Sequence, residues 1–254
     1  IELKAVLITG AAQGIGLATA RHYAAMGWFV GLYDVNRQGI ADLLASGEFA
    51  NACGDYCDVT DYGSVQAMLA HFAGHSGGYL NLLVNNAGVL SIGPFAEIDY
   101  RDHERMFDVN IRGATHTLQA AYALLRNTPG AVVVNLCSAS SIHGLPRLAV
   151  YSASKFYIDG LTEALDLEWR NDDIRVTCVK PPVIDTAMGR AVSAEMPQKL
   201  AGELDAGDVA VLIQRAAEGR GTSFPMGFSA RAWYLLDKIL PNALRHRLTA
   251  YLTT

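Results

Sequence analysis

Short apolar runs alternate along the chain with longer stretches in which apolar residues recur every three or four positions. The short runs predict buried strands, and the longer stretches predict amphipathic helices. The expected strands cover residues 5–9, 28–33, 50–57, 80–84, 131–136 and 174–179, and the expected helices cover about 15–26, 37–46, 61–75, 100–126 and 151–170. This alternation predicts an α/β fold, a doubly wound parallel sheet of the Rossmann type with helices on both faces.

The alternation contains no internal repeat, low-complexity tract or linker, so we expect residues 1–254 to form a single domain. Residues 185–207 are polar and irregular, and we interpret them as a mobile substrate loop over a site. Residues 228–254 form an apolar and basic tail. An amphipathic basic helix can make peripheral contact with a membrane. We favour packing of its apolar face on this domain or on a neighbouring subunit, where it would help to cover an apolar substrate pocket.

Composition limits which partners and which cellular location we expect for the protein. The net charge of −5 gives no reason to expect nucleic acid, and no apolar run is long enough to span a bilayer. The four cysteines are Cys53, Cys57, Cys137 and Cys178. No second Cys/His pair at metal spacing accompanies the first two, so we expect no metal site and no disulfide. A reducing, cytoplasmic location is the simplest interpretation.

Three glycines follow the first strand and open the first helix, in the order Gly10, Gly14 and Gly16, with Gln13 and Ile15 between them. Glycines in this context allow a tight turn and the close approach of a phosphate to the unpaired N–H groups of a helix N-terminus. An ordinary strand-to-helix turn is the alternative for the glycines alone. We expect a dinucleotide site.

Asp34 ends the second strand, eighteen residues after Gly16. A carboxylate there accepts hydrogen bonds from the adenosine ribose and repels a 2′-phosphate, so it favours NAD over NADP. Gln13 supports NAD because it is not basic. Arg37 lies close by, and an NADP(H)-dependent ketone reductase in which Arg37 overrides Asp34 is the alternative.

Further polar groups follow later strands, at the carboxyl edge where ligands of such sheets bind. We expect Asp58 and Val59 to reach the adenine, and Asn86, Ala87 and Gly88 to lie beside the cofactor. Ser138 follows the strand at 131–136, and Tyr151 and Lys155 are spaced to lie on one helix face. An ammonium beside a phenol lowers the pKa of the phenol, which would make Tyr151 an acid/base group near neutral pH.

The chain resembles the short-chain dehydrogenase/reductase family over residues 5–186. The matching motifs are T-G-A-A-Q-G-I-G, Asp58, N-N-A-G, Asn110 in V-N-I-R-G, Ser138 and Y-S-A-S-K. The resemblance implies that Tyr151 is the catalytic acid/base, that Lys155 binds the nicotinamide ribose and lowers the pKa of Tyr151, and that Ser138 orients the substrate oxygen. It further implies that Asn110 anchors a water in a proton relay.

The chain departs from the family pattern in two places. Pro181-Pro182 stands where the family usually has Pro-Gly, which alters the turn that precedes Ile184 and Thr186, the residues at the family's carboxamide contacts. The C-terminus lacks the Asp-Gly-Gly ending common among bacterial reductases of the family and continues into the tail instead.

The resulting hypothesis is an oxidoreductase that transfers a hydride between NAD(H) and a small secondary alcohol or ketone. By resemblance, residues 122–125 and the apolar face of 152–168 would form a subunit interface, giving a homodimer or homotetramer. Further candidates for the pocket wall are Ser140, His143, Leu145, Pro146 and Met188. A non-catalytic regulator that senses NAD is the alternative from another class, but it would not need Ser138, Tyr151 and Lys155.

Overall fold

A seven-stranded parallel sheet forms the centre of the computed structural model, which describes residues 3–195 and 201–253. The strand order is β3-β2-β1-β4-β5-β6-β9. The strands are β1 (Ala5–Thr9), β2 (Phe29–Asp34), β3 (Ala52–Tyr56), β4 (Leu82–Asn85), β5 (Val132–Leu136), β6 (Arg175–Lys180) and β9 (Ser223–Pro225). Two further strands, β7 (Val183–Asp185) and β8 (Ala201–Asp205), pair in parallel as a small separate sheet.

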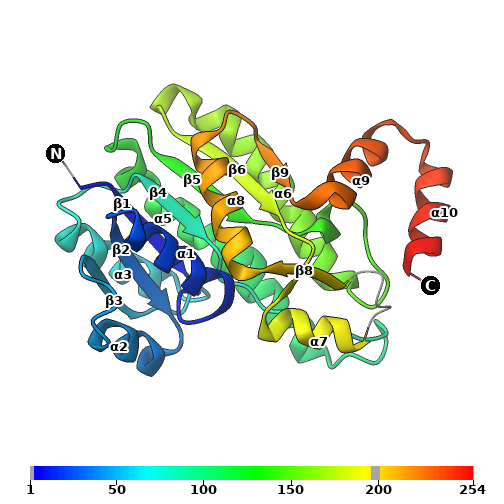
Figure 1. Ribbon diagram of the computed structural model, residues 1–254, viewed down its shortest axis with the longest axis horizontal. Coiled ribbons are helices and arrows are strands. Elements are labelled where there is room, and N and C mark those ends of the chain that lie inside the picture. The colour runs from blue at the N-terminus through cyan, green and yellow to red at the C-terminus, as the bar shows by residue number, and fades with distance from the viewer. Residues whose placement is uncertain (1–2, 196–200, 254) are drawn as a thin grey trace.

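Helices cover both faces of the central sheet (Figure 1). They are α1 (Gly14–Ala25), α2 (Arg37–Ala45), α3 (Tyr62–His75), α4 (Tyr100–Met106), a π-helix (Phe107–Gly113), α5 (Ala114–Arg126), α6 (Ala149–Glu168), α7 (Ala187–Glu195), α8 (Ala206–Glu218), α9 (Gly227–Ile239) and α10 (Asn242–Thr253). Helices α1 and α8 share the apolar core of one face, and α3 and α5 share that of the other. Helices α9 and α10 lie beyond β9 at one end of the molecule (Figure 1).

Local sequence explains where these elements begin and end. All five side chains of β1 are buried, as expected for a central strand covered on both faces. Asp61 caps α3 by accepting a hydrogen bond from the N–H of Gly63, and Asp205 and Asp208 form a reciprocal capping box on α8. Helix α1 ends before Gly27, whose φ of +78° is a conformation that glycine adopts without strain.

Buried amides fix β4, β5 and α6 relative to one another. Nδ2 of Asn85 donates to Oδ1 of Asn135 at 3.2 Å, and Nδ2 of Asn135 donates to Oγ1 of Thr162 at 2.9 Å. All three side chains are buried. Because an unpaired buried amide is costly, this chain of hydrogen bonds selects one register of β4 on β5 and one placement of α6.

The predicted Rossmann-type sheet and its first six strands are confirmed, while the C-terminal part differs from the prediction. The stretch 100–126 is two α-helices joined by a π-helix. Residues 185–207, expected to be irregular, contain α7 and β8, and they are followed by α8 and β9, which the sequence did not predict. Residues 196–200 of the expected substrate loop lie outside the described residues. Within the described chain, no helix has both the length and the apolar character needed to cross a membrane.

Candidate active site

The carboxyl ends of β1 and β4 are joined where the strand order reverses. Oγ1 of Thr9 accepts hydrogen bonds from the backbone N–H groups of Asn86 and Ala87, both at 3.1 Å. Nδ2 of Asn86 donates to the carbonyl oxygens of Thr9, at 2.8 Å, and Gly10, at 3.0 Å. The two predicted motifs therefore form one structure at the edge where ligands of doubly wound sheets bind.

The glycine turn has a backbone conformation and a close packing that residues with a Cβ could not adopt without strain. Gly10 and Gly14 have φ values of +68° and +55°, and a Cβ on Gly16 would lie 2.0 Å from the carbonyl oxygen of Gly10. Gln13 is the N-cap of α1 but makes no side-chain cap hydrogen bond, so the first N–H groups of the helix face outward without a side-chain acceptor. Ile15 packs on the core below them. These residues fit the pyrophosphate of a dinucleotide.

Asp34 lies beside this turn at the end of β2. Its Oδ2 accepts a hydrogen bond from the N–H of Ala12 at 3.0 Å, and its Oδ1 accepts one from the N–H of Asn36 at 2.9 Å. Each oxygen keeps a further lone pair for a ribose hydroxyl. Nη1 of Arg37 pairs with Oδ1 of Asp55 at 3.5 Å, so this guanidinium is directed toward β3.

Asp58 and Val59 follow β3 on the same edge, but their groups are engaged within the turn. Oδ1 of Asp58 accepts hydrogen bonds from the N–H and the hydroxyl of Thr60, at 2.9 and 2.8 Å. Val59 is buried, and its carbonyl oxygen lies 3.1 Å from Nδ1 of His116. Asp58 therefore stabilises the turn, and its second carboxylate oxygen is the one left for a ligand.

Ser138, Tyr151 and Lys155 come together at the end of β5. Ser138 begins a single turn of 3₁₀-helix and accepts a hydrogen bond from the N–H of Ser140 at 3.2 Å. Tyr151 and Lys155 lie one turn apart on α6, with Nζ of Lys155 5.6 Å from the centre of the phenol ring. Nζ also donates to the carbonyl oxygen of Leu136 at 2.8 Å, which holds the ammonium at the sheet edge.

The pKa of Tyr151 differs in direction from the prediction. Burial raises the pKa of Tyr151 to about 12, although the hydrogen bond with the Ser138 hydroxyl lowers it in part. Burial also lowers the pKa of Lys155. The sequence predicted a lowered pKa for Tyr151 because of Lys155. In the structure the loss of solvent around the phenol is the larger effect, so the neutral phenol is favoured.

Asn110 lies in the π-helix and holds the segment that follows β4. Its Oδ1 accepts from the N–H of Val89 at 2.8 Å, and its Nδ2 donates to the carbonyl oxygen of Val89 at 2.9 Å and to Oγ of Ser154 at 3.1 Å. A Cβ added to Gly88 would lie 3.4 Å from Oδ1 of Asn110 and 3.6 Å from Nζ of Lys155. Both Nδ2 protons of Asn110 are therefore used inside the protein.

Thr186 lies against the glycine turn from the other side, while Ile184 is buried in the core. A Cβ on Gly14 would be 3.7 Å from Cγ2 of Thr186. The carbonyl oxygen of Pro181 accepts a hydrogen bond from the N–H of Ala139 at 2.9 Å. The Pro181-Pro182 turn thus binds the loop that carries Ser138, and Thr186 rather than Ile184 faces the predicted cofactor region.

Tyr151 packs against a group of apolar side chains. Leu148 and Val192 form a small buried cluster, against which Tyr151, Leu145 and Val183 pack. Val192 belongs to α7. This helix, which lies in the predicted substrate loop, therefore packs in the same cluster as Tyr151. Of the other predicted wall residues, Pro146 and Met188 are exposed, and Ser140 is buried.

The C-terminal tail reaches the loop between Ser138 and Tyr151 through His143. Nδ1 of His143 lies 3.6 Å from Oδ1 of Asp237, and its ring centre is 6.3 Å from that of Trp233. Nη1 of Arg245 pairs with Oδ2 of Asp237 at 3.0 Å, which joins α9 to α10. The side chains of Phe228, Leu248 and Tyr251 lie outside the described residues.

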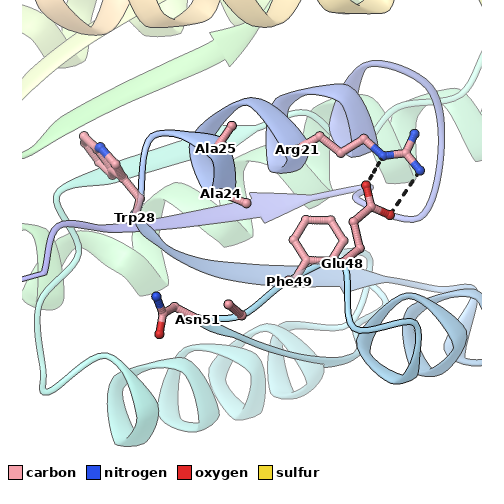
Figure 2. Close-up of a pocket in the computed structure, with 8 residues that line it drawn as sticks. Arg21, Ala24, Ala25, Trp28, Glu48, Phe49 and Asn51 are labelled. Atoms are coloured by element: carbon pink, nitrogen blue, oxygen red, sulfur yellow. Dashed lines mark hydrogen bonds and ion pairs between the residues drawn. The ribbon is translucent and has the colours of Figure 1, made fainter.

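A surface hollow lies elsewhere, on the opposite edge of the sheet. Figure 2 shows it between α1 and the segment before β3, with an ion pair between Arg21 and Glu48 across it and the side chains of Trp28 and Phe49 at its walls. These residues lie at the amino ends of β2 and β3. Because ligands of such sheets bind at the carboxyl ends, this hollow is not the catalytic cleft.

Comparison with known proteins identifies the family. Residues 4–197 match the family model described as short chain dehydrogenase. The chain belongs to the short-chain dehydrogenase family. It is similar to D-threitol dehydrogenase of Mycolicibacterium smegmatis, with 34% identity over 191 residues, which are 74% of this chain and 73% of the relative. The protein is therefore an oxidoreductase of this family that acts on alcohols or ketones.

Two solved structures of short-chain dehydrogenases show how far the likeness in fold extends. One from Burkholderia phymatum, in complex with NAD, has a TM-score of 0.83 at 26% identity and covers 100% of this chain and 96% of its own. One from Burkholderia cenocepacia, in complex with NADP, has a TM-score of 0.83 at 24% identity and covers 97% of this chain and 98% of its own. The fold alone thus does not select between the two cofactors.

In this short-chain dehydrogenase, the sequence did not indicate two residues, one packed near Tyr151 and one in contact with the loop that precedes it. Val192 was not singled out, although its helix α7 has buried residues that a helical pattern could have revealed. Asp237 contacts His143 from nearly a hundred positions away, and no sequence signal places them together. Of residues 122–125, predicted to contribute to a subunit interface, Leu125 is fully buried and Tyr122 packs on Trp169, while Ala123 is exposed.

Proposed function

We propose that the protein is an NAD(H)-dependent dehydrogenase that interconverts a secondary alcohol and its ketone, with Tyr151 as the acid/base. The observation that carries this proposal is the meeting of Ser138, Tyr151 and Lys155 at the end of β5. The Ser138 hydroxyl lies close enough to Tyr151 to lower its pKa in part, and Nζ of Lys155 lies 5.6 Å from the tyrosine ring. A substrate oxygen would bind where these three groups converge. Tyr151 would supply the proton, Ser138 a second hydroxyl and Lys155 a fixed positive charge.

Each residue has a distinct task in this proposal. NAD(H), when bound, supplies the hydride acceptor or donor. The neutral phenol that burial favours is the form of Tyr151 that gives a proton to the oxygen of a ketone during reduction. Oxidation of an alcohol needs the phenolate, which the Lys155 ammonium and the Ser138 hydroxyl would stabilise. Lys155 would also bind the nicotinamide ribose.

In this proposal Asn110 acts by holding neighbouring residues in place. Because both of its Nδ2 protons are used on Val89 and Ser154, any water on a relay from Lys155 would bind its carbonyl oxygens instead. The π-helix places it here, and such local distortions are frequent at functional sites. We propose that Asn110 holds the Val89 segment against Lys155 and accepts a relay water.

We propose NAD as the cofactor because of Asp34. Its carboxylate lies beside the glycine turn and keeps lone pairs for the ribose hydroxyls, and a 2′-phosphate there would meet a negative charge. Arg37, the residue that could have reversed this preference, is paired with Asp55. An NADP(H)-dependent reductase remains the second candidate, and it would require Arg37 to leave that pair.

The substrate would bind between Tyr151, α7 and the C-terminal tail. Leu145, Val183 and Val192 give this region an apolar wall, and the contact of His143 with Asp237 brings α9 to its edge. We propose a substrate with an apolar part next to its hydroxyl-bearing carbon. In this proposal, α7 is the part of residues 185–207 that contacts the substrate.

We further propose that the protein is a homodimer or homotetramer in a reducing, cytoplasmic environment. Phe156 and Tyr157, on the outer side of α6, are 43% and 39% exposed, and a second copy would cover them. All four cysteines are buried free thiols, as a reducing compartment would keep them.

The test is direct. The purified protein is titrated with NADH and NADPH, and a panel of secondary alcohols and ketones is assayed with the preferred cofactor. We expect tighter binding of NADH and turnover of at least one substrate. Tyr151→Phe should bind NADH like the original chain but lose activity by more than about 100-fold. NADPH preference would refute the role of Asp34, and retained activity in Tyr151→Phe would refute the mechanism. NADH binding without any turnover would point to the NAD-sensing regulator.

A further inference from the structure

A cysteine and two histidines meet at the β3 edge of the sheet, away from Ser138. His71 and His75 lie one turn apart on α3, and Cys53 lies on β3. One ligand atom from each is within 4.8 Å of the others. Cys53 is buried, His71 is half-buried and His75 is exposed, so the group combines a protected thiol with access from solvent. Strands β2, β1 and β4 separate it from β5.

The hydrogen bond of His75 fixes which of its nitrogens is available. Nδ1 of His75 lies 2.8 Å from the carbonyl oxygen of His71. A carbonyl only accepts, so Nδ1 carries the proton, and in the neutral ring Nε2 keeps its lone pair. Histidines that bind metals are oriented in this way, with the other N–H donated to a backbone carbonyl or a carboxylate.

Tyr33 connects the other two residues. Its hydroxyl oxygen lies 2.8 Å from Nδ1 of His71 and 3.4 Å from Sγ of Cys53. When Nδ1–H of His71 donates to this oxygen, the hydroxyl proton can be donated to the sulfur, and Nε2 of His71 keeps its lone pair. One hydroxyl thus orients an imidazole and supports a thiolate at the same time.

We propose that Cys53, His71 and His75 bind one zinc ion, with water as the fourth ligand. One thiolate and two imidazoles are ligands that Zn²⁺ prefers, and a tetrahedral ion needs ligand atoms about 3.3–3.8 Å apart, from bonds of about 2.0–2.3 Å. One ligand atom from each residue already lies within 4.8 Å of the others, so the three side chains converge on one point that an ion could occupy. On binding, the Cys53 thiol releases its proton to solvent and the sulfur bonds to the metal.

The proposed ion would join α3 to an edge strand of the sheet. Among the described strands of the central sheet, β3 pairs with β2 alone, and Cys53 is the second residue of β3. Through Tyr33 the ion would also connect to β2, whose next residue is Asp34. Zinc would therefore stabilise the part of the sheet that carries the proposed ribose site, and its binding is independent of whether the protein turns over an alcohol.

Cobalt(II) tests the site because its spectrum reports the ligands. The reduced full-length protein is titrated with Co²⁺ and then with Zn²⁺. We expect one equivalent of Co²⁺ to bind with the visible bands of a tetrahedral site and a near-ultraviolet sulfur-to-cobalt band, and one equivalent of Zn²⁺ to displace it. Zinc should also raise the midpoint of thermal unfolding by a few degrees.

Variants assign the ligands. Cys53→Ser and His75→Gln should each weaken binding by more than about 100-fold, since even losing an outer hydrogen-bond partner costs about 10–100-fold. Because His75 is exposed, its variant tests the site without disturbing the core. The matched controls are Cys57→Ser, a second buried thiol, and His246→Gln, an exposed histidine, and both should bind metal normally. No sulfur band in the original chain, or unchanged binding in His75→Gln or Cys53→Ser, would overturn the proposal.

Discussion

A buried ion pair lies directly behind the loop that carries Ser138. Nζ of Lys180 is 2.7 Å from Oδ2 of Asp159, and the two side chains are 2% and 19% exposed. Burial by itself lowers the pKa of Lys180, but the hydrogen bond and charge of Asp159, together with the nearby Cys178 and Cys137, outweigh burial, and the pKa of this ammonium is raised. Lys180 precedes Pro181, whose carbonyl oxygen binds the N–H of Ala139. Losing the pair would therefore affect both stability and the site.

We predict that Asp159→Ala lowers the free energy of unfolding by about 3–5 kcal/mol, because it leaves a buried ammonium without its counter-charge. For a chain of this size this corresponds to a fall in melting temperature of roughly 6–20 °C, at about 2–4 °C per kcal/mol. Adding Lys180→Met removes the second charge and keeps an unbranched apolar side chain. The double variant should recover most of the loss.

Urea unfolding at neutral pH, followed by circular dichroism, measures both effects. The matched control is Glu48→Gln, which breaks the exposed pair with Arg21 shown in Figure 2, and it should cost no more than about 1 kcal/mol. Because the pKa of Lys180 is raised in the folded state, its contribution is complete below pH 10.5 and is lost as the pH rises through the folded value. A loss below about 1 kcal/mol in Asp159→Ala, or a double variant as unstable as the single one, would refute the reasoning.

Three further predictions concern the cofactor and the tail. Gly16→Ala should weaken NADH binding by more than about tenfold, or ~1.4 kcal/mol, because its Cβ would lie 2.0 Å from the carbonyl oxygen of Gly10. Isothermal titration measures this, and Gly160→Ala, where a Cβ meets nothing within 4 Å, is the control. Asp34→Ser should weaken NADH and relax discrimination against NADPH, and equal losses for both cofactors would count against a ribose contact. A chain ending at Phe228 should show a raised KM for its alcohol, and an unchanged KM would exclude the tail from the pocket.

The central sheet could be predicted because its strands are continuous apolar runs covered on both faces. α8 could have been predicted as well, since its buried residues Val209, Leu212, Ile213 and Ala216 follow a helical spacing and Asp205 with Asp208 forms a capping box. β9 could not, because three residues, Ser-Phe-Pro, carry no period and become a strand only by pairing with β6.

The candidate site shows the same division between local and tertiary information. The glycine turn and the Tyr151–Lys155 spacing are local patterns, so the sequence indicated them. The pKa of Tyr151 depends on how much solvent the fold removes, and the sequence predicted its direction wrongly. His71 and His75 were visible as a pair at helical spacing, but the approach of Cys53 and Tyr33 depends on how α3 packs on the sheet.

The π-helix at Phe107–Gly113 has a consequence for how this chain tolerates insertions and deletions. A π-turn holds one residue more than an α-turn, so α4 and α5 are out of phase by about 100° relative to one continuous α-helix. Deleting one residue from this segment would let the helix become regular. It would also rotate everything on one side of the deletion by that angle, separating Asn110 from Val89 or α5 from its core. The extra residue thus sets the rotation of α5 relative to Asn110 and the candidate site. We therefore expect a change of length in this segment to be more damaging than most changes of side chain.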